Sequence, residues 1–69
     1  MTPHELLLRA VAITGSREKL ARWLTQNSKA VTARTLFNWA HHPSRIRFGS
    51  LLAMCELCGI NISDISPED

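Results

Sequence analysis

The chain has 69 residues, of which 45% are hydrophobic, and a formal net charge of +2 at pH 7. This length is close to the lower limit at which one domain buries enough apolar surface to fold alone, so we expect one domain with short loops. The apolar runs are too short for a membrane span, and the first residues lack the basic segment followed by an apolar segment that is typical of a signal peptide. We therefore expect a cytoplasmic protein with no membrane partner, in which the two cysteines are reduced.

The basic residues are concentrated in the middle of the chain. All eight Lys and Arg residues lie between Arg9 and Arg47, whereas only one of the six acidic residues, Glu18, falls in that window. Such segregation produces a positive field of the kind that a polyanion-binding surface requires. The alternative is a solvated helix surface that happens to be basic.

The first helix is predicted by its two ends. Thr2 and Glu5 have the spacing of a capping box, with Pro3 at the first helical position, and Gly15 is placed to end the helix. The predicted buried stripe consists of Leu6, Ala10 and Ile13, widened by Leu7 and Val11.

The second helix is expected over residues 17–24, with Ser16 as its N-cap. Leu20 and Leu24 pair on the buried side, and Ala21 is small enough for another helix to cross closely. Trp23 lies off the centre of this face. We expect it to pack beneath the following loop, the alternative being an exposed anchor for a partner.

The third helix follows the polar, turn-forming residues 25–30 and begins either with Ser28 as its cap or at Thr32. It ends by His42, since the residue before a proline is pushed out of the helical region. Apolar and polar residues separate onto opposite faces of this helix. The apolar face holds Val31, Leu36 and Trp39, and the polar face holds Thr32, Arg34, Thr35 and Asn38. An ordinary surface helix, whose polar face only meets water, would show the same separation.

A fourth helix is expected from Phe48 to Cys58, ended by Gly59. Its predicted apolar face consists of Phe48, Leu51, Leu52, Cys55 and Cys58. The segment 60–65 is either a short strand or a helical turn starting at Ser63, and residues 67–69 form a loose acidic tail. These elements predict a compact all-α domain of four to five helices over residues 1–66.

The second and third helices resemble the helix-turn-helix of the lambda repressor and Cro class of phage-type regulators. That family has a small Ala where the recognition helix crosses the second helix, an aliphatic residue followed by Ser or Thr before the recognition helix, and apolar residues at the buried positions. The matching residues here are Leu20, Ala21, Leu24, Val31, Thr32, Leu36 and Trp39. The resemblance extends over residues 6–65, because a Gly that closes the fourth helix and a short apolar turn are also typical of such domains.

The chain departs from the family in the turn. The family places one residue, usually Gly, between the positions of Leu24 and Val31, whereas this chain has the six residues 25–30. Three explanations are open: the second helix continues further, the third begins earlier, or the loop bulges towards the ligand. The docking angle on DNA depends on which of these holds.

The resemblance implies a sequence-specific regulator of transcription that binds double-stranded DNA, with a recognition helix at about 31–41 in the major groove. Its expected base-reading residues are Thr32, Arg34, Thr35 and Asn38. The residues assigned to phosphates are Arg17, Lys19, Gln26, Asn27, Lys29, Arg45 and Arg47. Because one recognition helix reads few base pairs, a homodimer on a palindromic operator is expected.

The alternative function is a helical protein-interaction module, such as an antirepressor or an adaptor, which binds another regulator through Trp23, Phe37 and the apolar C-terminal segment. The two functions differ in salt dependence, since DNA binding weakens steeply as salt rises.

Other chemistry is not expected. Cys55 and Cys58 have the spacing of a zinc half-site, and His41 with His42 would complete four ligands. Both cysteines, however, fall in the apolar stripe of a helix, and adjacent histidines rarely hold one ion. The histidines suit the C-terminal dipole of the third helix. The sequence has no paired carboxylates at helical spacing, phosphate loop or activated nucleophile, so we expect no enzyme activity, metal, cofactor or small-molecule substrate.

Overall fold

The first helix of the computed structural model, which describes residues 1–66, is α1 (Pro3–Thr14). Its predicted capping box is present: the Glu5 amide donates to Thr2 Oγ1 at 3.2 Å, and the Thr2 amide donates to Glu5 Oε1 at 3.4 Å. Gly15 ends the helix in the left-handed conformation, with φ of 104°. Leu6, Leu7 and Ala10 are buried as predicted.

The prediction for Ile13 is wrong, because its side chain is 52% exposed. Ile13 lies in the last turn of α1, where the next residue, Thr14, is half-buried, and Val11 is half-buried as well. The buried side of this turn is therefore that of Thr14, four residues after Ala10, and Ile13 lies at its edge.

Helix α2 (Arg17–Asn27) starts at the predicted cap, where Ser16 Oγ accepts from the Lys19 amide at 3.1 Å. Leu20, Ala21 and Leu24 are buried. Trp23 is half-buried and packs against the core. The helix continues three residues past the predicted end at Leu24, so the extra residues before the third helix are partly helical.

Helix α3 (Ala33–His41) begins after Thr32, whose Oγ1 accepts from the Thr35 amide at 3.2 Å, so Thr32 and not Ser28 is its cap. The turn between α2 and α3 is thus residues 28–32. Helix α3 ends at His41, in agreement with the predicted end before Pro43, and a short 3-10 helix, η1 (Pro43–Arg45), follows it.

Helix α4 (Phe48–Cys58) has the predicted bounds and ends at Gly59 in the left-handed conformation, with φ of 69°. The prediction of its buried face is partly wrong, since Phe48 is 65% exposed and Leu52 is 39% exposed. The face that enters the core consists of Ser50, Ala53, Met54 and Cys55. The helix is apolar on most sides, so hydrophobic periodicity alone does not identify the face that packs.

The C-terminal segment is helical, not extended. A 3-10 helix, η2 (Ile62–Asp64), replaces the possible strand over residues 60–65. The Ser66 amide donates to the Met1 carbonyl at 2.7 Å, and the Met1 ammonium donates to the Asp64 carbonyl at 3.1 Å. The end of the described chain is therefore tied to its start. The predicted loose tail at 67–69 lies outside the described residues.

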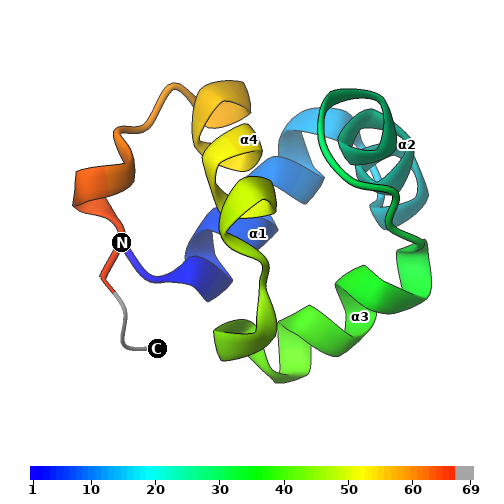
Figure 1. The fold of residues 1–69 in the computed structure, drawn as a ribbon, viewed down its shortest axis with the longest axis horizontal. Helices are drawn as coiled ribbons and strands as arrows, with labels where there is room; N and C mark the ends of the chain where they lie inside the picture. The colour runs from blue at the N-terminus through cyan, green and yellow to red at the C-terminus, as the bar shows by residue number, and fades with distance from the viewer. Residues whose placement is uncertain (67–69) are drawn as a thin grey trace.

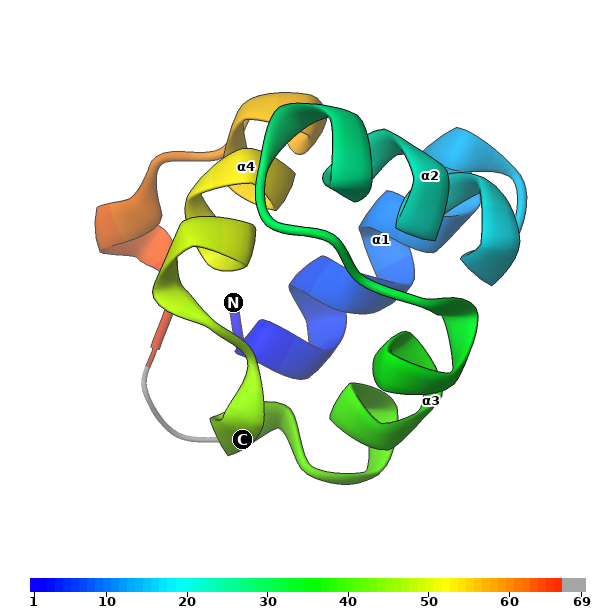
Figure 2. The ribbon, with the colours of Figure 1, turned by 45° about the vertical axis from the view of Figure 1, so that its right-hand side comes forward.

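The protein is all-helical over residues 1–66, with α1 in the middle, α4 on one side of it, and α2 and α3 on the other (Figures 1 and 2). The folded chain is compact, with extents of 25 × 23 × 20 Å. Its core is formed by residues from all four α-helices, together with Val31 and Ile46 from the connections. Within this described part, no helix has the length and apolar character needed to cross a membrane.

Candidate nucleic-acid interface

Helix α3 has one buried and one exposed face. Leu36 is fully buried and Trp39 is 5% exposed, and both are part of the core. The opposite side carries the exposed residues Arg34, Phe37 and Asn38. Because these side chains are exposed, a ligand can approach α3 along this side.

The four predicted base-reading residues differ in their surroundings. Arg34 and Asn38 are exposed and lie one helical turn apart, and their side chains make no hydrogen bond to any of residues 1–66. Thr32 is exposed, but its Oγ1 already caps α3 and lies 3.1 Å from Thr35 Oγ1. Thr35 is half-buried. The structure thus places Arg34 and Asn38 together as free polar groups, while the two threonines are paired with each other at the start of the helix.

Aromatic contacts cover the remainder of the exposed face. The Phe37 and His41 rings have centroids 4.5 Å apart, and His41 Nδ1 lies 3.0 Å from the Phe37 carbonyl oxygen. The Arg17 guanidinium carbon lies 5.1 Å from the Phe37 ring centroid. His41 was not among the residues predicted for this face, although the spacing of four residues between Phe37 and His41 indicates neighbours on a helix. No feature of the sequence indicated the contact between Arg17 and Phe37.

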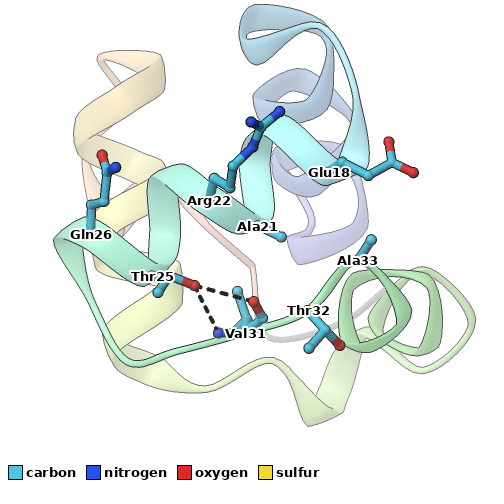
Figure 3. Close-up of a pocket in the computed structure, with 8 residues that line it drawn as sticks. All are labelled: Glu18, Ala21, Arg22, Thr25, Gln26, Val31, Thr32 and Ala33. Carbon is cyan, nitrogen blue, oxygen red and sulfur yellow. Dashed lines mark hydrogen bonds between the residues drawn. The ribbon is translucent and has the colours of Figure 1, made fainter.

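The turn before α3 is fixed by one side chain of α2. Thr25 Oγ1 accepts from the Val31 amide and donates to the Val31 carbonyl oxygen, both at 3.2 Å (Figure 3). Both backbone polar groups of Val31, which is 8% exposed, are therefore satisfied. Since Val31 immediately precedes the cap of α3, this contact sets where α3 starts relative to α2.

An open groove lies between α2 and the start of α3 (Figure 3). Its lining residues are Glu18, Ala21, Arg22, Thr25, Gln26, Val31, Thr32 and Ala33. Gln26, which was assigned to phosphates, lies on this groove and is exposed. Asn27 belongs to α2 and donates through Nδ2 to the Trp23 carbonyl oxygen at 2.8 Å. The structure therefore places Gln26 and Asn27 on a helix and not in a bulging loop.

The basic residues assigned to phosphates are all exposed, but they occupy separate places. Arg17 lies against α3, Lys19 lies beside Gly15, and Arg45 is part of η1. Lys29 and Arg47 are close together, where the turn meets the start of α4.

Arg47 Nη2 donates to the Ala30 carbonyl oxygen at 3.2 Å, and its guanidinium carbon lies 5.6 Å from the Trp39 ring centroid. Arg47 thus also holds the turn against the core.

The cysteines are free thiols in an apolar setting. Cys55 is 3% exposed, and burial raises the pKa of its thiol, with smaller effects in the same direction from Cys58 and Asp64. Burial also raises the pKa of the Cys58 thiol, against an opposing effect of Arg9. A raised pKa favours the neutral thiol, which is a weak nucleophile and a poor metal ligand. Among the residues described, no three His, Cys, Asp or Glu side chains group as a metal site would need.

Comparisons of this chain with protein-family models, with curated proteins and with solved structures found no match.

Proposed function

We propose that this protein is a sequence-specific regulator that binds double-stranded DNA by inserting α3 into the major groove. The observation that carries the proposal is the pair Arg34 and Asn38, whose exposed side chains make no hydrogen bond within residues 1–66, on a helix whose other face is buried. Polar side chains that are held on a rigid helix and have no partner in the protein are suited to bind groups outside it. In this proposal α2 and α3 are a helix-turn-helix with a lengthened turn.

The side chains match the chemistry of the groove. The major groove admits one α-helix, Arg donates two hydrogen bonds to guanine O6 and N7, and Asn pairs with adenine N6 and N7. Arg34 and Asn38 lie one helical turn apart, so they reach neighbouring base pairs. Each such contact contributes about 1–3 kcal/mol of discrimination against the wrong base.

In the proposal, affinity comes from positive charge near α3. Arg17 lies next to the exposed face of α3, and Arg45 lies on η1, which follows α3 in the chain. Phosphate contacts of this kind give salt-dependent affinity without sequence information. In the proposal a homodimer, acting in the cytoplasm as a phage-type or prophage-type repressor does, places two copies of α3 on a palindromic operator.

A second candidate, a protein-interaction module, is favoured by a different observation. Phe48 is 65% exposed and Leu52 is 39% exposed, one turn apart on α4. Exposed apolar side chains at helical spacing, such as Phe48 and Leu52, are typical of surfaces that bind a partner protein.

Selection of binding sites from a random pool of duplex DNA tests the first proposal against the second. We expect the wild-type protein to enrich a short motif. Asn38→Ala should lose the preference at one position of that motif, while Arg45→Ala, a change on η1, should keep the motif and lower only the affinity. If the wild-type protein enriches no motif, sequence-specific DNA binding is contradicted. A pull-down in which Phe48→Ser loses a partner that Asn38→Ala retains would then support the interaction module.

A further inference from the structure

Helix α3 carries one large apolar side chain on its exposed face, that of Phe37. Among residues 1–66, the other large apolar side chains that are exposed lie on α1 and α4. Phe37 is 45% exposed, so a substantial part of its ring meets water in the free protein. Apolar surface of this kind gains free energy when a ligand covers it with another apolar group.

Phe37 lies beside the two residues proposed to read bases. Arg34 precedes it by three residues, and Asn38 follows it directly. His41, four residues after Phe37, is also exposed. Residues three and four apart are neighbours on a helix surface, so these four side chains form one continuous patch. A ligand that contacts both Arg34 and Asn38 therefore also meets the Phe37 ring.

The ring of Phe37 is held by two contacts. The Arg17 guanidinium carbon lies 5.1 Å from the ring centroid, and the His41 ring lies at 4.5 Å with an angle of 46° between the two planes. The exposed fraction of 45% is what remains with both neighbours in place. Because the ring is positioned before a ligand arrives, less side-chain freedom is lost on binding than for a free phenylalanine.

The chemistry of the major groove limits what this ring can contact. The base edges carry hydrogen-bond donors and acceptors, and the one apolar group among them is the C5-methyl group of thymine. A phenyl ring placed on a donor or acceptor would leave that polar group buried without a hydrogen bond, which costs free energy. The ring therefore suits the methyl group and disfavours the polar edges of the other bases.

We propose that Phe37 contacts the C5-methyl group of a thymine next to the bases read by Arg34 and Asn38, and so selects thymine at that position. The proposal rests on the proposed function, because it requires α3 to lie in the major groove. It assigns the specificity of α3 to an apolar contact in addition to two polar ones.

The experiment replaces each thymine of the selected motif in turn by deoxyuridine, which removes the methyl group and keeps the base pair. Binding to each duplex is measured by fluorescence anisotropy. We expect the wild-type protein to bind about fourfold more weakly when one particular thymine is replaced, the effect of one buried methyl group. Phe37→Ala should bind the two duplexes equally, whereas Phe37→Leu, which keeps an apolar side chain, should retain part of the difference.

The matched control is Phe48→Ala, which removes the other phenylalanine of the chain, 65% exposed and on α4. It should keep the wild-type ratio of affinities for the thymine and deoxyuridine duplexes. This ratio is compared within each variant, so a general loss of affinity or of stability in Phe37→Ala does not change it.

Two results would overturn the proposal while the proposed function stands. In the first, the wild-type protein binds the motif but is insensitive to deoxyuridine at every thymine. In the second, Phe37→Ala keeps the wild-type sensitivity. A wild-type protein that binds no DNA at low salt would contradict the proposed function and this contact together, so the two failures are distinguishable.

Discussion

The guanidinium of Arg17, at the first position of α2, lies over the ring of Phe37 in α3, with its carbon Cζ 5.1 Å from the ring centroid. Phe37 is 45% exposed, so this contact is on the surface, at the exposed face of α3. It joins the two helices outside the core, and it places a positive charge beside Arg34 and Asn38 on the face proposed to meet DNA.

A double-mutant cycle of Arg17→Ala and Phe37→Leu measures this contact. We expect a coupling of about 0.5 kcal/mol in the free energy of unfolding, because exposed cation–π pairs are at the low end of their range. Urea unfolding of the four proteins gives the value. Lys19→Ala in place of Arg17→Ala is the matched control and should show no coupling to Phe37, and equal coupling for the two changes would contradict the assignment.

We expect Thr32 to contribute mainly to stability, as the N-cap of α3. Thr32→Ala removes the acceptor for the Thr35 amide and should lower the free energy of unfolding by about 1 kcal/mol. Thr32→Ser keeps the hydroxyl and should restore most of that loss, which thermal unfolding of the three proteins will show. Wild-type stability in Thr32→Ala would mean that the cap contributes nothing.

Thr25 is expected to be essential to the turn. Thr25→Val has nearly the same shape but leaves the amide and the carbonyl of Val31 without their partner at 3.2 Å, so we expect a loss of about 1–3 kcal/mol in the free energy of unfolding. Thr25→Ser, which retains the hydroxyl, serves as control in the same denaturation experiment. If Thr25→Val and Thr25→Ser were equally stable, the hydrogen bonds to Val31 would not hold the turn.

The buried thiols predict a loss of stability at alkaline pH. Burial raises the pKa of Cys55 in the folded protein, so above about pH 8.5 the unfolded chain releases a proton that the folded chain keeps. The folded state then binds more protons, and the free energy of unfolding falls as pH rises through this range, while below it the thiol has no effect on the slope. We expect denaturant unfolding at several alkaline pH values to show that the free energy of unfolding falls less steeply with pH in Cys55→Ala than in the wild-type protein. Identical slopes for Cys55→Ala and the wild-type protein would contradict the prediction.

Local sequence signals predicted the helices well, because their ends depend on neighbouring residues. Thr2, Ser16 and Gly59 have the predicted capping roles. The errors concern tertiary contacts. The exposure of Ile13 and Phe48 depends on which sides of α1 and α4 the rest of the chain covers, which a helical wheel does not contain.

In the candidate site, too, local features could be predicted from the sequence and tertiary contacts could not. Helical periodicity placed Leu36 and Trp39 inside, so Arg34 and Asn38 could be predicted to point outwards. The long-range contacts could not be predicted. The contact of Arg17 with Phe37, and the link from Thr25 across the turn to Val31, depend on the packing of α2 against α3.

The most direct test of the DNA-binding proposal is a fluorescence anisotropy titration with duplex DNA that carries the selected motif, at low and at high salt. Arg34→Ala is compared with Arg9→Ala, which removes the same charge from an exposed position on α1 beside the end of α4. We expect binding to weaken steeply with salt and Arg34→Ala to cost about 1–3 kcal/mol of binding free energy, while Arg9→Ala has little effect. Equal effects of the two changes, or no binding at low salt, would rule out base reading by α3.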